Sequence, residues 1–153
     1  MSILPETEMV TLISNSPDET AALGECWGRT APRGWLVGLD GDLGAGKTQL
    51  VKGLARGLGI TELVHSPTFA LINQYAGGRL PLFHLDFYRL ETPAEIQGAG
   101  LDEYLFDPAG VTVVEWIERW PGFPSVQPGR FRRVSIACVS ESERRICYED
   151  FGA

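Results

Sequence analysis

The chain has 153 residues, of which 44% are hydrophobic and 10% aromatic, a composition that supports one globular domain over residues 1–153 and argues against two. Its formal net charge of -7 argues against a protein that grips nucleic acid phosphates unaided, because that affinity comes chiefly from clustered Lys and Arg. Three cysteines without a CxxC pair, no basic leader and no long apolar run predict a cytoplasmic protein rather than a disulfide framework or a membrane span.

The first elements predicted along the chain are a helix and a buried strand. Residues 16–19, SPDE, combine a capping residue, a proline at the first helical position and a glutamate three residues after the cap, so a helix should run to about Arg29. The residues expected on its inner face are Leu23, Cys26 and Trp27. The short apolar run WLVGL, residues 35–39, then suits a strand that is buried on both faces.

A second helix and a β-hairpin should follow. Apolar residues recur at helical spacing between positions 50 and 58, and Gly59 is placed to end this helix. The segments FALINQY, residues 69–75, and LPLFHLD, residues 80–86, flank the turn AGGR. Two apolar runs on either side of a glycine turn predict a hairpin.

The last predicted elements complete an α/β pattern. Residues 92–95 repeat the capping pattern and predict a helix, and a short helix should follow near residues 101–105. Residues 110–116, GVTVVEW, are typical of another buried strand, and residues 132–139 and 144–151 should be closing strands that run antiparallel to each other. This order predicts an α/β fold with a mixed sheet.

The glycine-rich loop before the second helix carries a specific motif. Residues 41–48, GDLGAGKT, fit G-x-x-x-x-G-K-[ST] between a predicted strand and a predicted helix, the setting that a phosphate-binding P-loop requires. Its N-H groups would point at phosphate oxygens, Lys47 would reach the β- and γ-phosphates, and the Thr48 hydroxyl would bind Mg²⁺. The alternative, an accidental glycine-rich turn, is expected in roughly one chain of this length in a hundred.

ATP is the nucleotide expected at this loop. The chain contains only two lysines, Lys47 and Lys52, and neither stands in an N-K-x-D motif of the kind that recognises guanine. The residues expected to bind the nucleotide are Asp42, Leu43, Gly44, Ala45, Gly46, Lys47, Thr48, Gln49 and Trp116. For Trp116 the alternative remains open, because a tryptophan after a strand is more often part of the core.

Two carboxylates at predicted strand ends are the candidate acids. Asp86 ends LPLFHLD, where P-loop proteins carry their second magnesium-binding acid, although a strand-end aspartate can also simply cap a turn. Phe87 follows it, so the carboxylate for hydrolysis must come from elsewhere. Glu115 ends VTVV, and neighbouring strand ends in an open α/β sheet converge on the ligand crevice. It would orient or deprotonate water near the metal, with a surface glutamate as the alternative.

The segment HSPTF, residues 65–69, lies where switch segments carry a hydroxyl to the γ-phosphate. Thr68 is the candidate and Ser66 the substitute, although S-P-T is also an ordinary way to enter a strand. His65 and His84 are too few and too far apart for a metal site, so we expect satisfied structural histidines.

An arginine cluster lies near the closing strands of this acidic chain. Its members are Arg130, Arg132, Arg133, Arg144 and Arg145. A docking surface for protein or RNA and edge charges that discourage aggregation are both compatible with this pattern, and the second is favoured. No site is assigned to the cluster.

The four motifs GDLGAGKT, HSPTF, HLDFYRL and VEWIE together resemble those of the bacterial TsaE family, over roughly residues 14–139. These are small ATPases required for making threonylcarbamoyladenosine in tRNA. The resemblance implies a P-loop NTPase-like three-layer fold whose mixed sheet has a parallel centre and antiparallel flanking strands. It also implies association with the TsaD and TsaB subunits, and contact with tRNA only through that complex.

The resemblance assigns roles to individual residues as well. It implies that Lys47 and Thr48 serve the nucleotide and Mg²⁺, that Asp86 binds magnesium and that Glu115 acts in hydrolysis. It also implies that Thr68 belongs to the switch and that Trp116 lies near the nucleotide. The catalytic set is therefore Lys47, Asp86 and Glu115, and the metal set is Thr48, Asp86 and Glu115.

Three functions compete on this pattern. The leading hypothesis is a weak ATPase whose turnover depends on a protein complex and which resets or regulates the TsaD and TsaB transferase. A small-molecule kinase would need an acceptor pocket and usually an arginine-bearing lid, whereas here a hairpin occupies the segment before Asp86. A nucleotide-gated binding module that never hydrolyses ATP is the third.

Overall fold

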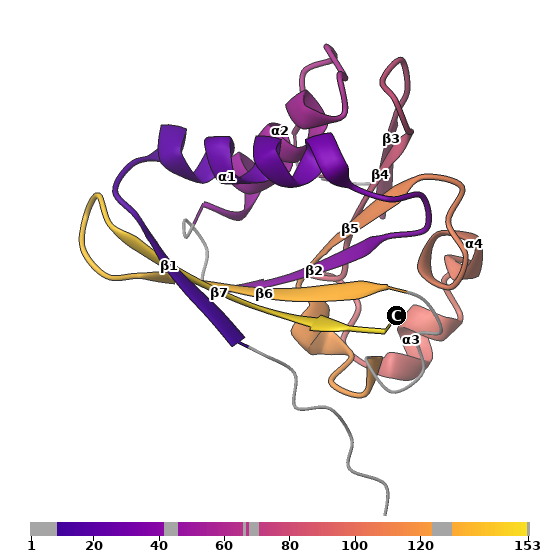
Figure 1. Ribbon diagram of the computed structural model, residues 1–153. Coiled ribbons are helices and arrows are strands. Elements are labelled where there is room, and N and C mark those ends of the chain that lie inside the picture. Colours follow the sequence, from indigo (N-terminus) through magenta and orange to yellow (C-terminus); the bar gives the residue numbers. More distant parts are fainter. Residues whose placement is uncertain (1–8, 42–45, 66, 68–70, 124–129, 153) are drawn as a thin grey trace, which may run out of the picture.

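A mixed sheet of seven strands organises the computed structural model, which describes residues 9–41, 46–65, 67, 71–123 and 130–152 (Figure 1). The strands are β1 (Met9–Ser14), β2 (Leu36–Gly41), β3 (Ile72–Tyr75), β4 (Leu82–Asp86), β5 (Val111–Glu115), β6 (Phe131–Cys138) and β7 (Arg144–Phe151). The helices are α1 (Pro17–Thr30), α2 (Lys47–Gly57), α3 (Pro93–Gln97), α4 (Asp102–Leu105) and the short 3-10 turn η1 (Ile117–Arg119).

The order of the strands across the sheet is β1-β7-β6-β2-β5-β4-β3. The four central strands β6, β2, β5 and β4 are parallel, whereas β3, β7 and β1 pair antiparallel with their neighbours. The predicted mixed α/β sheet with a parallel centre is therefore confirmed, as are the hairpin and the two antiparallel closing strands. All five residues of β5 are buried, as expected for a parallel strand with both faces covered.

Strand β1 was not predicted. Of its six residues only Ser14 is buried, and Met9, Leu12 and Ile13 are exposed, so the segment lacks the alternation that signals a strand. It pairs with residues 144–149 of β7. The arginine cluster therefore does not stand on the edge of the sheet, and the edge-charge interpretation is wrong.

Two of the clustered arginines have partners within the sheet. Arg132 makes a two-pronged ion pair with Asp150, with donor-acceptor distances of 2.6 and 2.9 Å, and its guanidinium lies 4.2 Å from the ring centre of Tyr148. Arg133 pairs with Asp40 at 3.1 Å. These contacts connect β6 to its neighbours β7 and β2.

Helices α1 and α2 pack at backbone distance on one face of the sheet (Figure 1). A Cβ atom on Gly24 would collide with the carbonyl oxygen of Leu50, and one on Gly53 would collide with that of Ala21. The inner face of α1 therefore consists of small residues beside the buried Trp27. The expectation that Cys26 belongs to it is wrong, because Ala21, Gly24 and Gly28 face α2 and the Cys26 side chain is exposed.

The sheet has an apolar core on each side. One cluster fills the space between the sheet and α1 and α2, and the other lies against α3, α4 and η1 on the opposite face. Within the described residues, no helix combines the length and apolar character that crossing a membrane requires. The single domain over residues 1–153 stays a prediction, and so does the P-loop class of the fold, because residues 42–45 lie outside the described ones.

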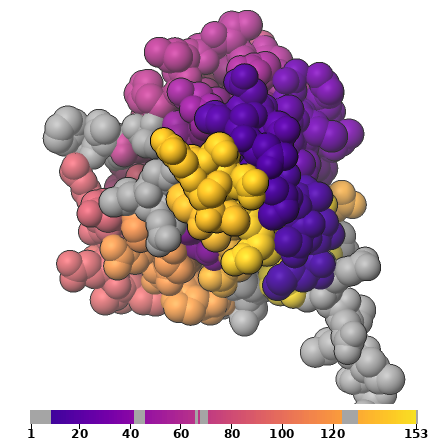
Figure 2. Space-filling model, turned by 90° about the vertical axis from the view of Figure 1, so that its left-hand side faces the viewer, coloured from indigo at the N-terminus to yellow at the C-terminus, as the bar shows by residue number. Residues whose placement is uncertain are grey.

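The parallel centre determines where side chains can meet. Because β6, β2, β5 and β4 run in one direction, their C-terminal ends emerge along the same side of the sheet. Figure 2 shows this side of the molecule, with the turn between β6 and β7 in yellow standing forward beside the indigo residues of β1 and α1. A ligand crevice in an open α/β sheet lies at such an edge.

Candidate functional site

A cavity of about 450 Å³ lies at the C-terminal ends of β4 and β5, beside the N-terminus of α2. Seven residues that the sequence pointed to line it: Gly46, Lys47, Thr48, Gln49, Asp86, Glu115 and Trp116. They come from three separate parts of the chain, which the sheet topology brings together. The other predicted site residues, Asp42, Leu43, Gly44, Ala45, Ser66 and Thr68, lie outside the described residues.

The N-terminus of α2 is open toward this cavity. Gly46 caps the helix in the left-handed region, with φ 100° and ψ 18°, and as a glycine it supplies no capping side chain. A Cβ atom at Gly46 would meet nothing within 4 Å among the described residues, and its positive φ is what favours glycine here. The positive end of the macrodipole of this 11-residue helix favours an anion at this position.

Lys47 begins α2 and is almost fully buried, with 5% of its surface exposed. Its Nζ atom donates to the carbonyl oxygen of Gly41 at 2.8 Å and lies 4.2 Å from the ring centre of Trp116. A carbonyl and an aromatic ring stabilise the ammonium group without neutralising its charge. The cavity therefore has a second feature that favours an anion.

Asp86 and Glu115 stand in partner positions on the parallel strands β4 and β5. Burial raises the pKa of the Asp86 carboxyl above its ordinary value of 3.8, and the nearby charge of Glu115 raises it further. The N-H of Tyr88, which donates to Asp86 Oδ1 at 2.8 Å, acts in the opposite direction, as do His84 and Lys47. Two adjacent carboxyl groups, of which Asp86 is partly buried and Glu115 almost fully buried, favour a bound cation.

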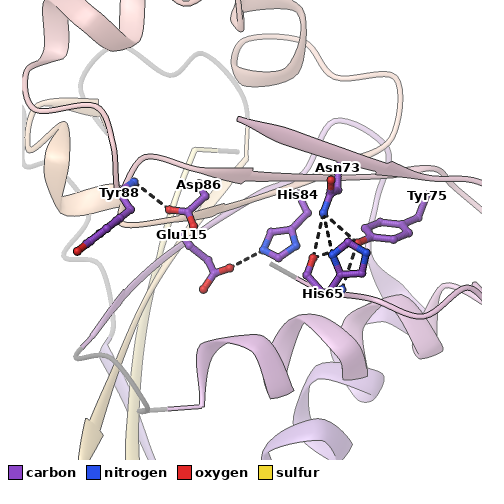
Figure 3. Close-up of polar contacts among 7 residues, drawn as sticks. All are labelled: His65, Asn73, Tyr75, His84, Asp86, Tyr88 and Glu115. Atoms are coloured by element: carbon purple, nitrogen blue, oxygen red, sulfur yellow. Dashed lines mark hydrogen bonds and ion pairs between the residues drawn. The ribbon is translucent and has the colours of Figure 1, made fainter. Parts of the chain in front are cut away.

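Glu115 is buried at the end of β5, with 4% of its surface exposed. Its Oε2 atom lies 2.6 Å from Nε2 of His84, a fully buried side chain on β4, as Figure 3 shows. The next residue, Trp116, is the one residue other than glycine in the described part of the chain with positive φ, at 63°. Such a backbone conformation is costly for a tryptophan and is typical of functional sites.

The described residues contain no cluster of three or more His, Cys, Asp or Glu side chains that could hold a metal ion by themselves. Mg²⁺, however, is commonly held by one or two protein oxygens together with phosphates and water. The donor set of the Thr48 hydroxyl and the Asp86 carboxylate, beside a phosphate-favouring helix end, fits that mode of binding.

The predicted switch segment begins next to the hairpin. The side-chain amide of Asn73 donates to the carbonyl oxygen of His65 at 3.0 Å, and the hydroxyl of Tyr75 donates to the same oxygen at 3.1 Å (Figure 3). These two bonds fix the main chain at His65, while its exposed imidazole lies 3.5 Å from the Asn73 amide through Nδ1, so the structural role expected of this side chain stays a prediction. His84 does not fit that expectation fully, because its Nε2 contacts Glu115 while its buried Nδ1 has no hydrogen-bond partner among the described residues.

Sequence reasoning missed about half of the cavity wall. The missed residues are Ser16, Pro17, Thr20, Tyr88, Glu141, Ser142 and Arg144. Most of them come from the start of α1 and from the turn between β6 and β7, two segments far apart in the sequence that the sheet pairings bring to this edge. For His84 a signal did exist, because it precedes Asp86 by two positions and therefore shares its face of the strand.

Comparison with known proteins identifies relatives along most of the chain. A family model described as threonylcarbamoyl adenosine biosynthesis protein TsaE matches residues 14–146. The tRNA threonylcarbamoyladenosine biosynthesis protein TsaE of Bacillus subtilis is 50% identical over 137 residues, 90% of this chain and 83% of the relative. The protein of the same name from Nostoc sp. is 46% identical over 121 residues, 77% of this chain and 74% of the relative.

A solved structure is similar over nearly the whole chain. The crystal structure of YdiB from Bacillus subtilis superposes with a TM-score of 0.79 at 35% sequence identity. The match covers 96% of this chain and 88% of the other.

Proposed function

The chain belongs to the TsaE family and is thereby involved in the biosynthesis of threonylcarbamoyladenosine in tRNA, and from this premise we propose that it is an ATP-binding and ATP-hydrolysing subunit. The proposed activity is weak in the isolated protein and is exerted mainly within the complex that forms the modified nucleoside. There it would reset or regulate the transferase formed by TsaD and TsaB.

One observation carries the proposal. A helix end and a buried lysine that favour an anion face the same cavity as a pair of carboxyl groups that favour a cation. A nucleoside triphosphate with its Mg²⁺ would satisfy both the anion-favouring and the cation-favouring parts of the cavity. Its phosphates would contact the N-terminus of α2 and Lys47, and the ion would contact Thr48 and Asp86. When bound, Mg²⁺ supplies charge neutralisation to the phosphate oxygens.

The remaining wall of the cavity would hold the rest of the nucleotide. Ser16 and Thr20 at the start of α1, Ser142 in the β6–β7 turn and Arg144 at the start of β7 line the same cavity. These side chains offer hydroxyl and guanidinium groups of the kind that contact a ribose or a base. A volume of about 450 Å³ lies within the range of small-molecule sites.

Glu115 is the proposed group for hydrolysis. Phe87, which follows Asp86, is fully buried and cannot orient water, whereas Glu115 lines the cavity in the neighbouring strand. Its carboxylate would orient the attacking water and accept its proton as the oxygen-phosphorus bond forms and ADP leaves. Trp116 would lie against the bound nucleotide, and its ring centre lies 4.2 Å from Nζ of Lys47.

The proposal of TsaD and TsaB as partner proteins is based on family membership and on the net charge of the chain. The net charge of -7 disfavours direct binding of tRNA, so tRNA would be reached through TsaD and TsaB. Switch residues Ser66 and Thr68 would report the nucleotide state to these partners.

Phosphate release from ATP, measured with and without TsaD and TsaB, tests the proposal. We expect slow release by the protein alone and stimulation by the partners. Formation of a phosphorylated metabolite instead of free phosphate would support a small-molecule kinase. ATP binding without any release of phosphate in the full complex would support a nucleotide-gated binding module.

A further inference from the structure

The buried contact between His84 and Glu115 takes no part in the nucleotide and metal binding proposed for the cavity. His84 is fully buried in β4, and the side chain of Glu115 is 6% exposed, so water does not compete for their 2.6 Å contact. His84 pairs in register with Val113, two positions before Glu115 on β5. The two side chains are therefore diagonal neighbours on one face of the sheet, and Glu115 leans back along the strand to reach the imidazole (Figure 3).

The hydrogen-bond partners of the two ring nitrogens indicate which of them carries the hydrogen in His84. Nδ1 of His84 is buried and has no partner in the described part of the chain. A bare ring nitrogen is tolerated there far better than an N-H group, which would lose its bond to water without replacement. We therefore place the hydrogen on Nε2, where it is donated to the Glu115 carboxylate.

We propose that His84 is a positioning residue for hydrolysis, which donates its Nε2-H to Oε2 of Glu115 and thereby fixes the orientation of that carboxylate at the cavity. The proposal rests on the proposed function of Glu115. A carboxylate at the end of a glutamate side chain has several rotamers, and only a narrow range of them can align an attacking water. A rigid donor on the adjacent strand selects one of them without touching the nucleotide.

A merely structural histidine and a positioning histidine respond differently to two conservative substitutions. In His84→Gln the side-chain amide can place an N-H where Nε2 stood, whereas in His84→Asn the amide is one carbon shorter and stands at the position of Nδ1. Both variants leave a polar amide in the same buried location. They differ chiefly in whether a donor still reaches Glu115.

Steady-state phosphate release in the complex with TsaD and TsaB provides the kinetic test. We expect kcat to fall by about tenfold or more in His84→Asn, with the KM for ATP within about twofold of the wild-type value. His84→Gln should retain kcat within about threefold. Equal kcat in both variants and the wild type, or an effect on KM instead of kcat, would overturn the proposal.

Nitrogen NMR of the histidine rings provides a test that needs no turnover. The chain has only two histidines, so the resonance lost in His84→Gln identifies His84. We expect a protonated Nε2, a bare Nδ1 and a strongly downfield Nε2-H proton that shifts upfield in Glu115→Ala. A hydrogen on Nδ1 in the wild-type protein would contradict the assigned bond without the use of any variant. An Nε2-H resonance that does not change in Glu115→Ala would contradict it as well.

The two proposals can fail separately. If Glu115→Gln leaves kcat unchanged, Glu115 has no role in hydrolysis and the positioning role of His84 falls with it, whatever the NMR spectrum shows. If Glu115→Gln is slow while both His84 variants are fast, the proposed function stands and only the role of His84 is refuted.

Discussion

Asp86 and Glu115 are in register on adjacent parallel strands, so two partly or fully buried carboxyl groups stand side by side at one edge of the sheet. Neither position is explained by packing, because each places a polar group where an apolar one would be more stable. The proposed cation site would account for this arrangement, which the folded protein maintains at some cost to its own stability.

Substitution of Asp86 should reveal that cost. The fold raises the pKa of the Asp86 carboxyl above 3.8, so the folded protein binds this proton more tightly than the unfolded chain does. The stability gained from this proton is complete below pH 3.8 and is lost as the pH rises through the raised pKa. At pH 7 the nucleotide-free Asp86→Asn protein should therefore unfold at a higher temperature than the wild type, and the difference should vanish below about pH 3.8. The gain should stay below about 1 kcal/mol, because water screens a partly exposed charge.

The control for this stability measurement is Asp107→Asn, which changes an exposed carboxylate outside the cavity and should leave the unfolding temperature unchanged. Asparagine at position 86 retains an oxygen that accepts from the N-H of Tyr88. A destabilised Asp86→Asn protein at pH 7 would mean that the carboxylate is favourable in the empty site.

Magnesium dependence tests the role of Thr48. We expect Thr48→Ala to weaken ATP binding by about tenfold in the presence of Mg²⁺, because the ion would lose a ligand. In EDTA the affinities of the variant and the wild type should be equal. Titration calorimetry under the two conditions measures this, and an equal loss of affinity in both would place Thr48 against the phosphates rather than the metal.

Glu115→Gln separates binding from chemistry. The amide oxygen can still accept from His84, so the fold and the affinity for ATP should change little. Phosphate release in the complex should fall by about a hundredfold, the lower end of what a general base contributes. An unchanged rate would remove Glu115 from the mechanism.

The close contact between α1 and α2 can be tested by a substitution that adds a single methyl group at their interface. In Gly53→Ala the new Cβ would collide with the carbonyl oxygen of Ala21, so the free energy of unfolding should fall by about 1–3 kcal/mol despite the better helix propensity of alanine. Gly122→Ala is the matched control, since its Cβ would meet nothing within 4 Å. Chemical denaturation compares the two, and equal stabilities would contradict the close packing of the helices.

The local parts of the fold and site could be predicted from sequence because their signals are local. The cap at Ser16 does accept from the N-H of Glu19 at 3.1 Å, and Gly59 has the left-handed φ of 83° that ends a helix. Lys47, Asp86 and Glu115 were found because a motif or a strand end marks each of them.

The parts that could not be predicted depend on contacts between distant segments. The exposed segment β1 is a strand because it pairs with β7, and no periodicity within residues 9–14 predicts this pairing. The same pairing brings Thr20 and Arg144 to one cavity. The exposed position of Cys26 likewise reflects a contact between distant segments, because α1 packs on α2 through facing glycines of both helices and not through the expected apolar stripe.

Binding of Mg²⁺ and ATP to the wild-type protein and to two lysine variants tests the central claim most directly. Titration calorimetry should give one saturable site for the wild type, no detectable site for Lys47→Ala, and an unchanged site for Lys52→Ala, whose half-buried lysine lies on the same helix outside the cavity. If the wild type binds no ATP, or if Lys47→Ala binds it as tightly as Lys52→Ala does, the cavity is not a nucleotide site.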